Sequence, residues 1–199
     1  MITRRCWCLR SCRNRNSKAK VAYIQTYNHS CSYCHFCSVG NNLLSMLSYN
    51  NEEYVLRLHR SSVYFVRAEL AKQAEAIINK NSLISLGICL GKFTKANNFF
   101  IKITSLSFLN EFCIHKIWLK ESGEKNFLFG NNVLKSHLLK VSDNIKKGDG
   151  IIVLSMNDSP IGFGISIRNT QDIKILNVTD IVLIHQGDVG EYLRSEATI

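Results

Sequence analysis

The chain has 199 residues, of which 46% are hydrophobic and 20% are charged, and its formal net charge is +10. This length suits one large domain or two small ones, and this balance is typical of a folded protein rather than a disordered one. The apolar runs are only a few residues long, whereas a membrane-spanning helix needs roughly 20 apolar residues. We therefore expect a folded protein with no membrane-spanning segment and no membrane partner.

The positive charge and the cysteines gather at the start of the chain. Residues 1–39 hold seven basic side chains, no acidic one, and six of the eight cysteines. The other 160 residues carry 18 basic and 15 acidic side chains, so their net charge is only +3. Any affinity of the folded part for nucleic acid must therefore come from a local basic patch.

The stretch HSCSYCHFCSVG at residues 29–40 has several interpretations. Its potential zinc ligands are Cys31, Cys34, His35 and Cys37, with Cys8 and Cys12 upstream at irregular spacing. An arginine-rich, acid-free start is also typical of an organellar targeting segment. No apolar core pattern surrounds these ligands, which weakens the zinc interpretation. We interpret residues 1–39 as a basic extension that is disordered or not native to the protein. We predict no resident metal.

Residues 40–113 have the pattern of a small α/β domain. The expected elements are strands at 54–60 and 62–67, a helix at 68–80, a strand at 99–106 and a short helix at 108–113. The two first strands alternate in polarity around a polar turn, which predicts a hairpin. The helix carries Leu70, Ala74, Ile77 and Ile78 on one side.

Residues 114–199 read as a run of short strands with one short helix, which suggests a small β-barrel. The expected elements are a strand at 115–120, a turn at 121–125, a short helix within GNNVLKSHL, a hairpin at 148–167 and one or two strands within 172–188. The predicted inward side chains of the hairpin are Ile151, Val153, Ile161 and Phe163. We expect Gly162 and Gly164 to let another backbone come close.

Several motifs, in order and spacing, carry a family resemblance. GDGIIVLSMNDSPIGFGIS, which follows LFGNNVLKSHL, resembles the PUA domain, a small RNA-binding barrel. Together with SLGICLGKFTK, NTQD and IHQGDVGEYLRSE, it is similar to the 60S ribosome subunit biogenesis proteins called nuclear import seven homologs, over about residues 40–199. The resemblance implies an α+β protein. Its N-terminal α/β domain has antiparallel strands flanked by helices, and a C-terminal PUA-type small β-barrel follows.

The resemblance also implies a function. Members of that family are non-catalytic RNA-binding assembly factors, required for pre-rRNA processing and for 60S subunit biogenesis. It implies pre-rRNA and the proteins of the pre-60S particle as partners. It also implies a nuclear and nucleolar location with some protein in the cytoplasm. We expect a monomer outside the particle. Residues 1–39 depart from the family, because they replace its acidic start and first amphipathic helix.

Two other functions stay open. An RNA-modifying enzyme can carry a PUA domain, but only residues 40–113 precede the PUA part here. They contain no glycine fingerprint for a cofactor and no acidic residue beside a base or nucleophile, so we predict no catalytic residue and no cofactor. The other function is a zinc-dependent interaction module at the N terminus.

The stretch GNNVLKSHL supplies the first candidate RNA contacts: Gly130, Asn131, Lys135, Ser136 and His137. At the start of a helix, free backbone N–H groups beside a lysine would suit a phosphate. The alternative is that an asparagine caps this helix and that Lys135 is solvated.

Further candidates lie elsewhere in the chain. Arg168 and Lys174 flank the last strands, where they could hold backbone phosphates. GKFTK, residues 91–95, places Lys92 and Lys95 on a basic turn that could contact rRNA or a neighbouring protein. It lacks the upstream glycine and the adjacent Lys–Ser/Thr pair of a nucleotide-binding loop. Near the C terminus, we interpret His185 as a structural histidine and leave Tyr192 either stacking on a base or anchoring the tail.

Overall fold

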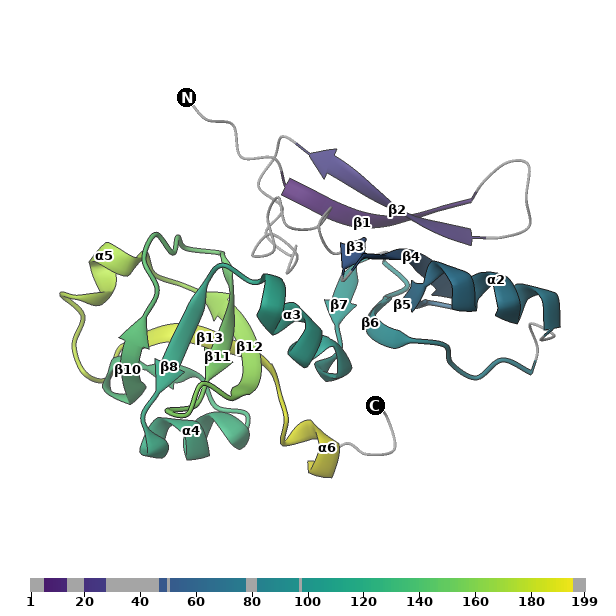
Figure 1. Ribbon diagram of the computed structural model, residues 1–199. Helices are drawn as coiled ribbons and strands as arrows, with labels where there is room; N and C mark the ends of the chain where they lie inside the picture. Colours follow the sequence, from purple (N-terminus) through teal and green to yellow (C-terminus); the bar gives the residue numbers. More distant parts are fainter. Residues whose placement is uncertain are drawn as a thin grey trace. The chain divides into compact units, whose positions relative to one another are not determined.

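A computed structural model of the chain describes residues 6–13, 20–27, 47–49, 51–77, 82–96 and 98–194. These residues form two compact units, of which the first ends at Ser105 and the second begins at Leu106. Each unit has a sheet of its own (Figure 1). Within the described ranges, no helix is long and apolar enough to cross a membrane.

The first described segments are two strands that pair with each other. β1 (Cys6–Arg13) and β2 (Lys20–Tyr27) run antiparallel as a two-stranded sheet. The predicted zinc ligands Cys31, Cys34, His35 and Cys37 lie outside the described residues, and so do the side chains of Cys8 and Cys12.

The main sheet of the first unit is an antiparallel meander with the order β3-β4-β5-β6-β7. Its strands are β3 (Ser48–Tyr49), β4 (Glu52–His59), β5 (Ser62–Arg67), β6 (Ile88–Phe93) and β7 (Phe99–Ile101). The predicted hairpin is confirmed, because β4 and β5 pair from Tyr54–Arg67 to His59–Ser62. The predicted strand 99–106 is shorter than expected. It gives way to the 3-10 helix η3 (Ile103–Ser105), where the Thr104 hydroxyl donates to the Cys89 carbonyl at 2.7 Å.

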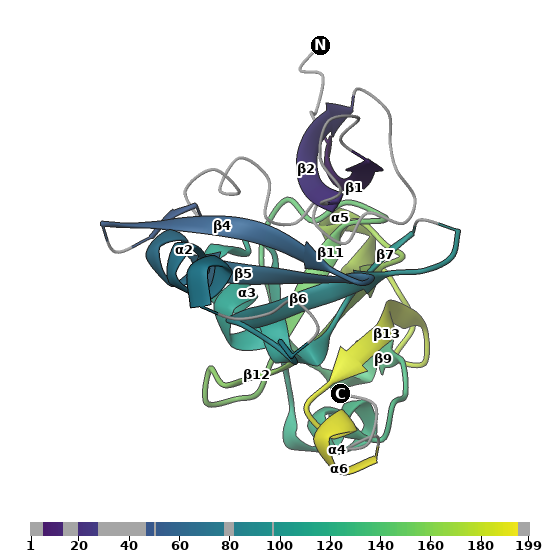
Figure 2. The same cartoon turned by 90° about the vertical axis from the view of Figure 1, so that its right-hand side faces the viewer.

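The predicted helix after β5 is confirmed as α2 (Ala68–Ile77). It packs against β4 and β5, and Figure 2 shows it lying along these strands. Ala71 is its buried residue, and Arg57 of β4 forms an ion pair with Glu75 at 3.2 Å. Of the apolar side read from the sequence, Leu70 and Ile77 are exposed and Ala74 is half-buried, while Ile78 lies outside the described residues.

The second unit is built around a six-stranded sheet with the order β10-β8-β11-β12-β13-β9. The elements are α3 (Leu106–Phe112), β8 (Lys116–Leu119), α4 (Glu121–Leu128), β9 (Val133–Leu134), η4 (Lys135–His137), β10 (Leu138–Val141), β11 (Gly150–Leu154), β12 (Pro160–Ser166), α5 (Thr170–Ile173), β13 (Ile181–Asp188) and α6 (Glu191–Arg194). β8 and β11 are parallel, whereas the other neighbours are antiparallel. The single turn η4 joins the two edge strands, β9 and β10, so the sheet curls almost into a closed barrel.

The core of this barrel confirms the predicted inward positions. Ile151, Val153 and Ile161 belong to one buried cluster with Ile117, Leu119, Phe127, Val133, Ile145 and Leu183, and Phe163 is buried as well. A Cβ at Gly162 would collide with the carbonyl oxygen of Gly187, and one at Gly164 with that of Ile184. The close approach of β12 to β13 therefore depends on these two glycines, as expected.

One expected element of the second unit is wrong, and another is confirmed only in part. The stretch 121–125 is not a turn but the first part of helix α4, in which Gly123 and Phe127 face inward one turn apart. The expected short helix within GNNVLKSHL is present only as the single 3-10 turn η4, and the strand β9 comes before it. Pairing with β13 overrides the local pattern, because Val133 lies opposite Leu183 and Leu134 lies opposite Ile181.

Candidate nucleic-acid interface

The backbone of residues 130–136 is already engaged within the protein. The N–H groups of Gly130 and Asn131 donate to carbonyls at the end of α4, at 2.9 and 3.3 Å. Those of Lys135 and Ser136 donate to the carbonyls of Asp180 and Val178, at 2.9 and 3.0 Å. The prediction that free backbone N–H groups at a helix start bind a phosphate is therefore wrong for these four positions.

The side chains of this segment are also held in place. The Lys135 ammonium donates to the carbonyl of Ile173, the last residue of α5. His137 Nδ1 accepts the N–H of Leu134 at 3.3 Å, and burial lowers the pKa of His137 below its ordinary value. Lys135 and His137 thus support the turn η4 and its contact with α5, while Ser136 stays exposed.

The loop before β11 is fastened to the segment that contains α5. Lys147 N–H donates to Asn169 Oδ1 at 3.1 Å, and Gly148 N–H donates to the Ser166 carbonyl at 2.7 Å. Ile145 N–H donates to Thr170 Oγ1 at 3.0 Å. These bonds bring two stretches that are some twenty residues apart in sequence into one surface.

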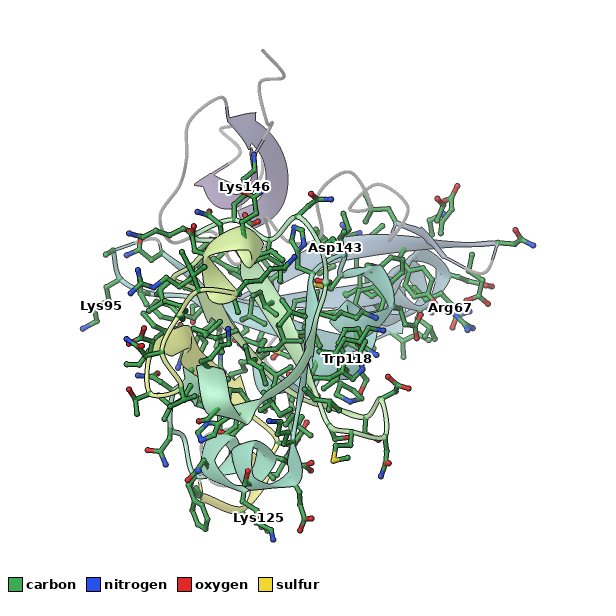
Figure 3. All side chains as sticks on the ribbon, turned by 90° about the vertical axis from the view of Figure 1, so that its left-hand side faces the viewer. Arg67, Lys95, Trp118, Lys125, Asp143 and Lys146 are labelled. Atoms are coloured by element: carbon green, nitrogen blue, oxygen red, sulfur yellow. The ribbon has the colours of Figure 1, made fainter. Side chains whose placement is uncertain are left out.

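Four exposed cations lie on this surface, which we call the α5 basic patch: Lys146, Lys147, Arg168 and Lys174. Arg168 precedes α5 and Lys174 follows it, so one turn of helix, about 6 Å long, separates them. Figure 3 shows the side chain of Lys146 projecting away from the barrel. In the described part of the chain, none of the four forms an ion pair with a carboxylate.

The local charge of the α5 basic patch is positive. With Lys135 beneath it, five cations face four carboxylates in the same or adjoining turns, those of Asp143, Asp149, Asp172 and Asp180. Three of these carboxylates are already acceptors: Asp149 takes a hydrogen bond from the N–H of Lys146 at 2.9 Å, Asp172 takes one from Asn169 at 2.6 Å, and Asp180 takes one from the N–H of Asn177 at 3.0 Å. Such a surface can hold phosphates of a nucleic-acid backbone at fixed positions.

Sequence reasoning found Arg168 and Lys174 but missed Lys146 and Lys147. Their signal was present as two adjacent lysines before the glycines that open β11, in NIKKGDG. Hydrogen bonds in the folded protein, from Lys147 to Asn169 and from Ile145 to Thr170, show that this loop adjoins α5.

Lys92 and Lys95 lie in the first unit and form a separate candidate contact. Lys92 is exposed on β6, opposite Phe100 of β7, and Lys95 is exposed in the turn from Thr94 to Asn98. That turn is closed by the Thr94 N–H, which donates to the Asn98 carbonyl at 2.9 Å. GKFTK is therefore the end of a strand and a turn, which differs from the strand-to-helix loop that binds nucleotide phosphates.

Known proteins resemble both units of the chain. The family model described as the NIP7/UPF0113 pre-PUA domain matches residues 18–103, and the one described as the UPF0113 PUA domain matches residues 115–197. The 60S ribosome subunit biogenesis protein nip7 of Schizosaccharomyces pombe is 42% identical over 161 residues, which cover 81% of this chain and 89% of that protein. The protein of the same description from Saccharomyces cerevisiae is 45% identical, with 81% and 88% covered. The homolog from Rattus norvegicus is 41% identical, with 81% and 89% covered.

Proposed function

The chain belongs to the NIP7 family of 60S ribosome subunit biogenesis proteins, and from this premise we propose that it is an RNA-binding assembly factor of the 60S subunit. Family membership confirms the resemblance read from the motifs. In this role the protein binds pre-rRNA, supports its processing, and acts without catalysis. It works in the nucleus and nucleolus, with some protein in the cytoplasm. Its partners there are proteins of the pre-60S particle, and outside the particle it is a monomer.

The observation that carries this proposal is the α5 basic patch on a PUA-type barrel. The net charge of residues 40–199 is small, so a general electrostatic attraction would not give much affinity for RNA. The patch concentrates cations from two chain segments, and their backbones are held by hydrogen bonds to Asn169, Thr170 and Ser166. Positioned cations bind phosphates with less loss of side-chain and loop freedom than mobile ones do.

Within this site, the residues take different roles. Lys146, Lys147, Arg168 and Lys174 contact phosphates directly. Lys135 positions α5 through its bond to the Ile173 carbonyl. Gly130, Asn131, Ser136 and His137 form the neighbouring edge of the barrel, and Lys92 and Lys95 provide a second contact from the first unit.

The test is an RNA-binding titration of the full chain with a large-subunit pre-rRNA transcript at several salt concentrations. The variant in which Lys146, Lys147, Arg168 and Lys174 are all replaced by alanine should bind at least about tenfold more weakly at physiological salt. The log–log salt slope should flatten by about 0.7 to 0.9 for each lost phosphate contact. In cells, RNA crosslinked to the protein should concentrate on large-subunit pre-rRNA.

Lys125→Ala is the matched control for this titration. Lys125 is an exposed lysine of the same unit, but its charge is already compensated by Glu121 at 2.8 Å. This variant should bind RNA as the unaltered protein does. Unchanged affinity and slope in the quadruple variant would remove the α5 basic patch from the RNA site.

A further inference from the structure

Three large apolar side chains are exposed where α4 and α6 end. Phe129, directly after α4, is 78% exposed, and Tyr192 and Leu193 of α6 are 46% and 89% exposed. Figures 1 and 2 both show α4 and α6 at the lower end of the second unit. Single exposed apolar residues are ordinary on a protein surface, whereas several together mark a site of interaction. We call these three residues the C-terminal apolar patch.

The buried carboxylate of Asp188 helps to hold α6, which carries Tyr192 and Leu193, at the end of α4, which precedes Phe129. Asp188, at the end of β13, has a fully buried side chain and accepts a hydrogen bond from Arg194 Nη2 at 2.7 Å. Arg194 Nη1 donates in turn to the carbonyl of Leu128, the residue before Phe129. Arg194 therefore fixes α6 against the end of α4.

Asp188 has two further hydrogen-bond partners, from its own strand and turn. Its Oδ1 accepts the N–H of Gly190 at 2.7 Å, and its Oδ2 lies 2.6 Å from His185 Nε2. His185 is therefore a structural histidine, as the sequence suggested. A buried charge is costly unless its partners are all in place, so this arrangement favours one position of α6.

Core packing does not explain why α6 is held so closely. None of its residues is buried, from Glu191 to Arg194. The hydrogen bonds of Arg194 to Asp188 and to Leu128 therefore do not serve to bring an apolar side chain of α6 into the core. The bond from Arg194 to the Leu128 carbonyl instead holds α6, which carries Tyr192 and Leu193, at the end of α4.

The charges around the patch are opposite to those of the α5 basic patch. Glu121 and Lys125 of α4 compensate each other at 2.8 Å, and Arg194 is engaged with Asp188. Glu124 and Glu191 remain, and within the described ranges neither forms an ion pair. An RNA phosphate would be repelled here, whereas a protein segment with both apolar and basic side chains complements the surface.

We propose that the C-terminal apolar patch docks a basic, amphipathic segment of another protein. Phe129 and Tyr192 supply the aromatic contacts that commonly dominate such interfaces, and Leu193 adds apolar area beside them. Glu124 and Glu191 then select basic over acidic segments at the rim. The proposal does not rest on the RNA site.

A binding experiment with two designed peptides tests this recognition on the full chain. One is a helical peptide that alternates leucine and lysine in an amphipathic pattern, and the other has glutamate in place of every lysine. The leucine–lysine peptide should bind, and the F129A/L193A variant should lose at least tenfold of that affinity. The leucine–glutamate peptide should bind the unaltered protein at least tenfold more weakly.

The matched control is the L139A/M156A variant, which removes two exposed apolar side chains from β10 and the β11–β12 turn. It should bind the leucine–lysine peptide as the unaltered protein does. Equal binding of both peptides, or full affinity in F129A/L193A, would contradict the proposal.

A photo-crosslinking amino acid at position 129 tests the docking inside cells, with the same group at position 156 as control. The expected adduct is a protein, and mass spectrometry should map it to a segment with apolar and basic residues. Adducts to RNA would overturn the proposal, as would adducts only to residues 195–199 of the same chain. A crosslinking yield at position 129 that is no higher than the yield at position 156 would also overturn the proposal.

Discussion

Gly123 is a residue at which α4 closely approaches the turn η4. It is buried, and a Cβ in its place would lie 2.5 Å from the Cβ of His137 and 3.0 Å from the His137 carbonyl oxygen. Both of these atoms belong to or adjoin the backbone, so they cannot swing aside as the end of a long side chain can. The His137 carbonyl also accepts the N–H of Lys120 at 2.9 Å, which holds it further.

We predict that Gly123→Ala destabilises the protein although alanine favours helices. The gain in helix propensity is about 1 kcal/mol, whereas overpacking in a filled site costs about 1 to 3 kcal/mol. Urea unfolding should therefore show a lower free energy of unfolding. Ser122→Ala, at an exposed position of the same helix, should be neutral or stabilising. A stabilised Gly123→Ala variant would show that α4 and η4 are not packed as described.

At the scale of elements, η4 is the connection that nearly closes the barrel. It joins β9 to β10, and its His137 holds Leu134, the last residue of β9, through the bond to Nδ1. This bond needs a neutral ring nitrogen, and burial lowers the pKa of His137 in the folded state. The unfolded chain, with an ordinary histidine pKa of about 6.5, takes up a proton more readily.

The stability of the second unit should therefore decrease in mild acid through His137. The contribution is present above the unfolded pKa and is lost as the pH falls through the folded pKa, because protons then favour the unfolded chain. Urea unfolding at a pH of about 7.5 and of about 5 should show a larger loss for the unaltered protein than for His137→Gln. Equal losses in the two proteins would assign the acid sensitivity to other groups.

At the scale of the molecule, the second unit carries two surfaces of different chemistry. Figures 1 and 2 place α5 and α6 at opposite ends of this unit, so the α5 basic patch and the C-terminal apolar patch are well separated. They share no residue and no hydrogen-bond partner. Substitutions at distant sites without common partners usually act independently.

We therefore expect the two binding activities to be separable. F129A/L193A should keep the RNA affinity within about twofold and leave the salt slope unchanged. The quadruple alanine variant of the α5 basic patch should still bind the leucine–lysine peptide. Loss of both activities in either variant would indicate that the two surfaces are coupled, or that the variant is misfolded, which circular dichroism would distinguish.

Much of the fold and part of the candidate site could be predicted from local patterns. The hairpin of β4 and β5, the helix α2 and the hairpin around Pro160 follow from alternation and turn residues within a few positions of each other. Gly162 and Gly164, between large apolar residues, indicated the close approach of β13. Arg168 and Lys174 were identifiable as exposed cations beside the last strands.

Contacts between distant segments decided the rest. The stretch 130–137 became strand and turn because β13, about fifty residues later, pairs with Val133 and Leu134. Lys147 joined the basic patch through Asn169, 22 residues away, and Arg194 fixed α6 through Leu128, 66 residues away. Sequence alone therefore determined the family, the barrel and most of its strands, whose patterns are local. The tertiary structure decided which cations and which apolar side chains share a surface, because that depends on pairings that local propensity does not encode.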